Sequence, residues 1–273
     1  MSDEDRVVMN QSDDPEMEAA SEKARKSFRY FWREMSWEYR RIIPGLDLAA
    51  VKVAFTDYDV APGDPDTEQM WVSEIQCDGK EFTGTLLNSP AWLTNINAGD
   101  PVCEPLSEIT DWMFSIRGKL YGGYTVNLLR SRMSSGERKE HDQAWGLDFG
   151  DPEEIEMVYV APEKEPGFLG RLFGKKAVIN PEEQRRAMIE HPMSFNMGES
   201  LLESLRESKE KLTAQDEDGW TMLHRDALAG NATIVKILLK HGADRNLKTP
   251  DGDTPLDLAR IFGWKHVIKL LSS

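Results

Sequence analysis

Histidines and clustered carboxylates are the side chains of this sequence that could carry acid–base or metal chemistry. The histidines are His141, His191, His224, His241 and His266. His141 alone has no evident structural place, in the segment Glu140-His-Asp-Gln-Ala-Trp145. A general base there needs a cleft and a hydrogen-bonded partner, and Asp142, in a strand, would face the other side. We therefore assign no catalytic residue, and an enzyme with an unrecognised site near His141 and Asp148 remains an alternative.

Four closely spaced carboxylates, Asp57, Asp59, Asp64 and Asp66, could hold calcium. However, the glycine and the final glutamate of an EF-hand loop are missing, so we interpret the segment as an acidic loop. Cys, His and carboxylate residues nowhere follow the spacing of a metal site. The sequence also lacks HExxH, GxSxG, P-loop and dinucleotide motifs, and Gly122-Gly123 near Lys119 indicates a turn more than a phosphate site. We expect neither a metal nor a cofactor.

The last third of the chain repeats at a spacing of 33 residues. A fixed period of this size is typical of stacked helical repeats, which build binding surfaces. The matched pairs are Gly219 and Gly252, Thr221 and Thr254, Leu223 and Leu256, Gly230 and Gly263, Val235 and Ile268, and Leu238 and Leu271.

The segments Asp218-Gly-Trp-Thr-Met-Leu-His224 and Asp251-Gly-Asp-Thr-Pro-Leu-Asp257 resemble the start of an ankyrin repeat. The two threonines are expected to cap helices, and Pro255 suits a first helical turn. Asp226 departs from the pattern, because the ankyrin family usually has a small buried alanine there. A lone buried carboxylate is costly, so Asp226 must find a hydrogen-bond partner, distort the repeat or contact a partner protein.

Two ankyrin repeats are too few to be stable alone, so a third is expected upstream. Ser200-Leu-Leu-Glu-Ser-Leu205 lies 33 residues before the second helix of the next repeat and predicts a degenerate cap repeat over residues 181–214. Trp220 falls at the tip of a repeat turn, where side chains project outward. We predict that it is exposed and contacts a partner.

The first half of the chain predicts a helix followed by short strands. Residues 1–19 form an acidic, unpatterned tail, and apolar residues at three- and four-residue steps predict a helix over 20–38. The strands are expected at 48–55, 68–75, 81–87, 101–106 and 155–160, and 124–130 is a helix or a strand. Because hairpin turns join consecutive strands, the sheet should be antiparallel.

Several blocks in order, from "VKVAF" and "EQMWVSEI" through "FTGTLLNSP" and "GGYTVNLLR" to "AWGLDFGDP", resemble the YegJ-like bacterial domain. The resemblance implies a fold and a bacterial origin, and no catalytic residue. The predicted fold class is α+β: an antiparallel-sheet domain with a flanking helix at 20–160, a linker at 161–180, and an all-α ankyrin stack at 181–273.

The negative charge is concentrated in the first domain. The chain carries a net charge of −15, yet residues 181–273 hold 15 acidic and 13 basic side chains. The rest holds 33 acidic and 20 basic side chains, with runs at 57–81 and 148–165. Such a field repels phosphate backbones and attracts basic partners, so we expect no direct contact with nucleic acid.

These features favour an immunity protein that binds and occludes a bacterial toxin, most simply a basic nuclease. The architecture resembles that of the protective partners of type VI effectors. A scaffold that uses its repeats to hold another protein is a further alternative. No apolar run spans a membrane, and Cys77 and Cys103 are taken as reduced, so a cytoplasmic location is expected. The predicted partner-binding residues are Asp57, Asp59, Asp64, Asp66, Asp218, Trp220, Asp226, Asp251 and Asp253.

Overall fold

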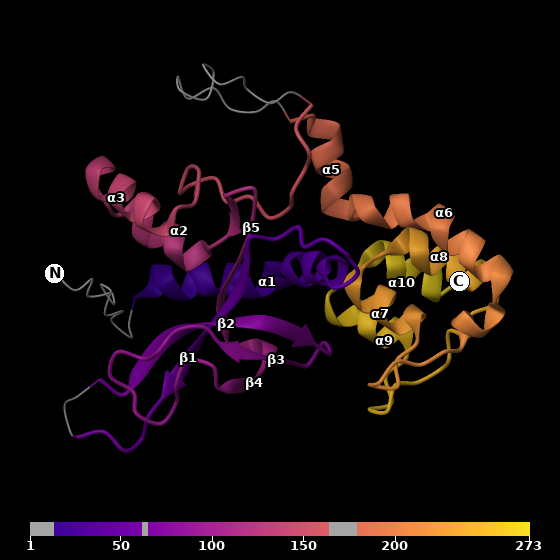
Figure 1. The fold of residues 1–273 in the computed structure, drawn as a ribbon, viewed down its shortest axis with the longest axis horizontal. Coiled ribbons are helices and arrows are strands. Elements are labelled where there is room, and N and C mark those ends of the chain that lie inside the picture. The colour runs from indigo at the N-terminus through magenta and orange to yellow at the C-terminus, as the bar shows by residue number, and fades with distance from the viewer. Residues whose placement is uncertain (1–13, 62–64, 164–178) are drawn as a thin grey trace. The chain divides into compact units, whose positions relative to one another are not determined.

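The computed structural model describes residues 14–61, 65–163 and 179–273 (Figure 1). Its residue contacts divide the chain into two compact units. One unit contains the chain up to Phe31 and Ile43–Met157, and the other contains Trp32–Ile42 and Val158–Ser273. The end of the first helix thus belongs with the repeats, which the boundaries drawn from the sequence do not anticipate. The linker segment 164–178 and residues 1–13 of the tail lie outside the described residues.

The first helix, α1 (Pro15–Glu38), starts five residues earlier than the apolar pattern predicts. The reason is a cap: the Asp14 carboxylate accepts the backbone N–H groups of Glu16 and Met17. Acidic side chains in the first turn also suit the positive end of the helix dipole. The predicted apolar stripe is confirmed, because Ala24, Phe28 and Phe31 are all buried.

Six strands form one antiparallel sheet in the order β4-β3-β2-β1-β5-β6, as the hairpin turns predicted. Segment 124–130 is helix α2 (Tyr124–Ser131), and α3 (Ser135–Trp145) follows it. Residues 155–160 form no strand; Glu156 contacts β6 through its carbonyl, which accepts the Gly122 N–H, and through its carboxylate, which pairs with Lys119. The strands are β1 Leu48–Thr56, β2 Thr67–Cys77, β3 Glu81–Leu86, β4 Pro101–Pro105, β5 Ile109–Ile116 and β6 Lys119–Gly122.

The two faces of the sheet differ. Trp112, opposite Val51 in the register, donates its indole N–H to the Ala24 carbonyl, which places α1 over this face. On the other face Met113 and Leu120 pack with Val126 and Phe149. Farther along that second face, over β2 to β4, side chains are exposed to solvent: Gln69, Thr83, Pro101 and Cys103.

A buried carboxylate holds the start of α2. Asp111 is fully buried, and it accepts the backbone N–H groups of Tyr124 and Thr125 and the Thr125 hydroxyl. Burial raises the pKa of Asp111, although Lys52 and these hydrogen bonds oppose the rise. The carboxylate fills the anion position at this helix start, so Gly122-Gly123 serves a turn, as the sequence indicated.

Both edges of the sheet are closed to strand pairing. The Leu86 N–H donates to the Asp100 carbonyl, and the Leu106 N–H donates to the Lys80 carbonyl. The even-numbered residues of β4 therefore direct their backbone N–H and C=O groups toward β3. The odd-numbered residues direct their backbone groups away from the sheet, and two of them, Pro101 and Pro105, have no N–H that could pair with another strand. At the other edge, an isolated bridge between Lys119 and Asp148 covers β6.

The repeat unit is helical throughout its described regular elements. Helices α7 and α9 pack together, as do α6 and α8, and α8 and α10. Helix α6 thus lies where the upstream repeat was predicted, and Gly198 allows its close approach to Ile237. The helices are α5 Pro181–Ile189, α6 Pro192–Glu207, α7 Met222–Ala229, α8 Ala232–Lys240, α9 Pro255–Ile261 and α10 Lys265–Leu271.

Replacing both edge prolines by threonine, Pro101→Thr with Pro105→Thr, should convert β4 into a pairing edge, because each change restores an outward N–H. We expect self-association that grows with concentration, measured by sedimentation velocity. The control is Pro90→Thr in a loop, which should leave the sedimentation coefficient unchanged. A double variant that sediments like the parent at every concentration would show that the prolines do not protect this edge.

Candidate functional site

The Thr254 side chain caps its helix as the sequence predicted, by accepting the Asp257 N–H, and His224 and Asp257 add hydrogen bonds that hold the two repeat turns. The His224 ring accepts the Thr221 N–H at Nδ1, at 3.1 Å, and its Nε2 lies 3.0 Å from the Leu247 carbonyl of the next turn. This pattern requires a neutral ring with its proton on Nε2. In the second repeat Asp257 replaces the histidine and completes a capping box with Thr254.

Asp226 finds its partner in the turn just after α1. Its side chain is fully buried, and its Oδ1 lies 2.8 Å from the Arg40 guanidinium and 2.8 Å from the Asn231 amide that donates to it. Asp226 therefore departs from the small alanine of the ankyrin pattern because it pairs with an arginine 186 residues away. The carboxylate is thereby used inside the molecule, and it does not present its charge to solvent.

The end of α1 makes two further contacts with the repeats. The Trp37 indole donates to the Asn231 side-chain oxygen at 3.0 Å. The Arg33 guanidinium donates to the Ala187 carbonyl and lies over the Trp264 ring. Together with the Arg40 pair, these contacts make residues 32–42 an integral element of the repeat unit.

A buried acid–histidine pair also joins α1 to the repeat unit. Glu34 lies 2.9 Å from Nε2 of His191, while Nδ1 of that ring accepts the Met193 N–H at the start of α6. Burial alone would raise the pKa of Glu34, but His191 and Arg41 outweigh it and the pKa is lowered. His191 thus joins α1 to the first helices of the stack.

The prediction that Trp220 is exposed is wrong. It is only 5 % exposed, because the Arg225 guanidinium covers its ring face and His224 packs against its edge. The acidic residues of the two turns behave differently: Asp218 and Asp251 are exposed, and Asp253 is half-buried. Asp218 also pairs with Arg225, so part of its charge is neutralised.

The acidic loop is partly turned inward. Asp57 is buried, and its carboxylate accepts the Thr94 N–H and hydroxyl, which with the Asp59 N–H lower its pKa. Glu68 is also buried and accepts the Ala91 N–H. The two carboxylates hold the loop that follows β3, a role that no sequence pattern indicated. Asp59 and Asp66 remain exposed, and Asp64 lies outside the described residues.

His141 is not in a strand, and it does have a carboxylate neighbour. It lies on α3, where Nδ1 is 3.0 Å from Asp142. Asp142, however, also forms two hydrogen bonds with the buried Arg130 guanidinium, which anchor α3 to α2. Asp148, the other residue of the enzyme alternative, accepts the Gly150 N–H within its own turn. The described residues contain no group of three metal-ligating side chains.

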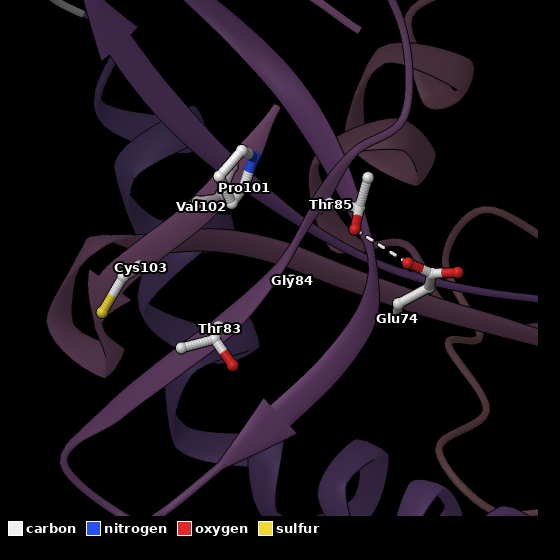
Figure 2. Close-up of a pocket in the computed structure, with 7 residues that line it drawn as sticks. All are labelled: Glu74, Thr83, Gly84, Thr85, Pro101, Val102 and Cys103. Atoms are coloured by element: carbon white, nitrogen blue, oxygen red, sulfur yellow. Dashed lines mark hydrogen bonds between the residues drawn. The ribbon is translucent and has the colours of Figure 1, made fainter. Parts of the chain in front are cut away.

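The open sheet face carries a shallow hollow (Figure 2). Its four corners are cross-strand pairs, Thr83 opposite Cys103 and Thr85 opposite Pro101. Its floor is the backbone between Gly84 and Val102, whose side-chain positions face the opposite side. Figure 2 shows Glu74 at the border, where its carboxylate accepts the Thr85 hydroxyl at 2.7 Å.

Known proteins match both parts of the chain. A family of bacterial proteins, DUF2314, matches residues 14–149, and ankyrin repeats match residues 210–259. An ankyrin repeat protein of Neisseria meningitidis is 43 % identical over 271 residues, which is 99 % of this chain and 98 % of that protein. The chain belongs to the DUF2314 family and carries ankyrin repeats. The resemblance to the YegJ-like domain is thereby confirmed.

Two further relatives of this DUF2314 protein match one part each. The uncharacterized protein YegJ of Escherichia coli is 30 % identical over 125 residues, 46 % of this chain and 74 % of that protein. The human NAD-capped RNA hydrolase NUDT12 is 38 % identical over 69 residues, only 15 % of that enzyme. The ankyrin repeats and the related proteins indicate a protein that interacts with other proteins. Within the described residues, no helix is long and apolar enough to cross a membrane.

Removing Arg40 should destabilise the repeats strongly, because Asp226 is left as a buried charge without a counter-ion. We expect Arg40→Met to lower the free energy of unfolding by roughly 3 kcal/mol, since breaking one side of a buried pair is costly. Combining it with Asp226→Ala, which restores the ankyrin residue, should recover most of that loss.

Urea unfolding of the parent and of these variants measures the changes in the free energy of unfolding. The matched control is Arg260→Met, which removes an exposed pair with Asp257 and should cost less than about 0.5 kcal/mol. Equal losses in the Arg40 and Arg260 variants would contradict the assigned role of Arg40.

The repeat unit should lose stability as the pH falls from 7 to 5. Burial lowers the pKa of His224 below the 6.5 of a free histidine, with Arg225 acting in the same direction and Asp216 and Leu247 against it. Below pH 6.5 the unfolded chain therefore takes up a proton that the folded chain does not, so unfolding is favoured. The urea midpoint at several pH values measures the slope.

His224→Gln should flatten this pH dependence, whereas His241→Gln, at a partly exposed ring, should leave it unchanged. A slope that survives in His224→Gln would contradict the explanation.

Proposed function

We propose that this protein binds a basic protein partner and blocks it by occupying its surface. The support is the charge distribution: the net charge is −15, and nearly all of the excess lies outside the repeats. An acidic surface speeds encounter with a basic partner and discourages binding to acidic ones. The repeats and the family relatives favour protein contacts over chemistry.

The proposed contact residues are the acidic side chains that remain accessible. In the first unit these are Asp59 and Asp66, on the loop between β1 and β2 to which Asp64 also belongs. Asp57 and Glu68 fix the base of this loop through internal hydrogen bonds. In the repeats, the turn residues Asp218, Asp251 and Asp253 are the proposed contacts, while Trp220 and Asp226 support the stack from within.

A nuclease toxin is the partner that this proposal favours, because a cleft that holds phosphates must be basic. In this form of the proposal the protein is an immunity protein, and the acidic loop takes the place of the nucleic acid in the cleft. Inhibition would be steric and electrostatic. A scaffold would use the same surfaces but would leave the activity of its partner intact.

Capture of the partner from the native host tests the proposal. The tagged full-length protein should retain a basic protein at about 0.05 M salt and release most of it at about 0.5 M, because salt screens exposed charges. The captured protein should cleave nucleic acid, and one equivalent of the purified protein should stop the cleavage. A tightly held companion that is acidic, or one whose retention ignores salt, would sink the proposal.

A matched pair of variants locates the contact. Asp59→Asn with Asp66→Asn should weaken capture about tenfold, since two charge pairs of roughly 0.7 kcal/mol each are lost. Glu199→Gln with Glu203→Gln removes the same charge from the exposed side of α6 and should have little effect. Equal weakening by both pairs would show that only the total charge matters and would contradict the loop as the contact.

A further inference from the structure

The hollow on the open sheet face is built by the local geometry of β2, β3 and β4. Between Ser73 and Gln76 the register shifts, and Glu74 adopts a left-handed backbone with φ of 57°. Such a bulge re-aims a side chain, here toward the hollow. Gly84 lies opposite the bulge, where a Cβ would come within 2.5 Å of the Ser73 carbonyl oxygen. The bulge and the glycine together bring Glu74 to the border of the hollow.

The side chains around the hollow define its chemistry. Thr83 and Thr85 supply hydroxyls, Pro101 supplies an apolar ring, and Glu74 supplies the one charged group of its lining. Partial desolvation of the Cys103 thiol and the nearby carboxylates, Glu81 first, raise its pKa, and it therefore stays neutral at pH 7. The hollow thus combines an apolar wall, hydroxyls and a negative charge, without a reactive thiolate.

Three kinds of occupant fit this hollow poorly. An added strand is blocked by the outward-facing prolines Pro101 and Pro105. An anion is repelled by Glu74 and by Glu81 and Glu104 nearby. A divalent metal needs several hard ligands, and the described residues bring no three such side chains together anywhere.

We propose that this hollow receives a lysine or arginine side chain of the basic protein partner. The aliphatic stem packs on Pro101, and the charged head donates to the Glu74 carboxylate, which keeps its hydrogen bond from the Thr85 hydroxyl. The proposal rests on the proposed function for its partner, and it adds a second contact, on the sheet face, to the acidic loop. In this proposal, the left-handed backbone of Glu74 serves to place its carboxylate at the hollow.

The side-chain preference can be measured without the partner. The probe is the short peptide acetyl-Gly-Arg-Gly-amide, titrated into the ¹⁵N-labelled full-length protein, with the citrulline peptide as an uncharged control of the same shape. We expect amide shifts confined to the lining residues Glu74, Thr83, Gly84, Thr85, Val102 and Cys103, several times larger for arginine than for citrulline. Shifts spread evenly over acidic surfaces, or equal for both peptides, would overturn the proposal.

Two variants separate the hollow from the general charge. Glu74→Gln keeps the acceptor for Thr85 and should weaken arginine-peptide binding about fivefold. Thr83→Arg should fill the hollow with the protein's own cation and abolish the shifts, while Gln69→Arg, exposed on the same face outside the lining, should preserve them. The amide spectrum of each variant reports whether it is folded. Unchanged binding in folded Thr83→Arg would overturn the proposal.

The two proposals fail in different ways. If Thr83→Arg still captures the host partner as the parent does, the hollow is not part of the interface, even though the blocking function stands. If the parent captures no basic protein, the proposed function fails, and the peptide titration alone decides whether the hollow prefers a cation.

Discussion

The repeat unit depends on one buried carboxylate. Asp226 is completely enclosed, one of its oxygens accepts from Asn231 and pairs with Arg40, and the other has no hydrogen-bond partner among the described residues. A charge in this position is tolerable only with its counter-ion in place. Arg40, just after α1, must therefore stay docked on α7, and Trp37, Glu34 and Arg33 add contacts between the end of α1 and other parts of the repeat unit.

This constraint decides which surfaces remain for a partner. Asp226 and Asn231 are already bonded to Arg40 and Trp37 of the same chain, so the proposed contacts are in the repeat turns and in the first unit. In the first unit the sheet edges are closed, by prolines on β4 and by the Asp148 bridge on β6. The exposed acidic loop and the open sheet face are two accessible surfaces among the described residues, and they are the ones to which we assign the proposed basic partner.

Local patterns predicted the fold well because they report local forces. The stripe of Ala24, Phe28 and Phe31 gave the helix, hairpin turns gave the antiparallel sheet, and the 33-residue period gave the repeats. The candidate functional site was harder to predict from the sequence. The Arg225 guanidinium covers Trp220, the Asp57 carboxylate bonds to Thr94, and Asp226 pairs with Arg40. The last two are contacts between distant parts of the chain, which a periodic pattern does not encode. The departure of Asp226 from alanine was the one available signal, since a buried acid demands a partner.

Hydrogen exchange of the full-length protein tests most directly whether residues 32–42 belong to the repeat stack. The amides of Trp37 and of α7 should open together, with the same free energy, and Arg40→Met should lower that free energy in both segments by the same amount. The amides of β1 and β2 should keep their protection. If α7 retains its protection in Arg40→Met while Trp37 loses it, the helix end is only an appendage and the account is contradicted.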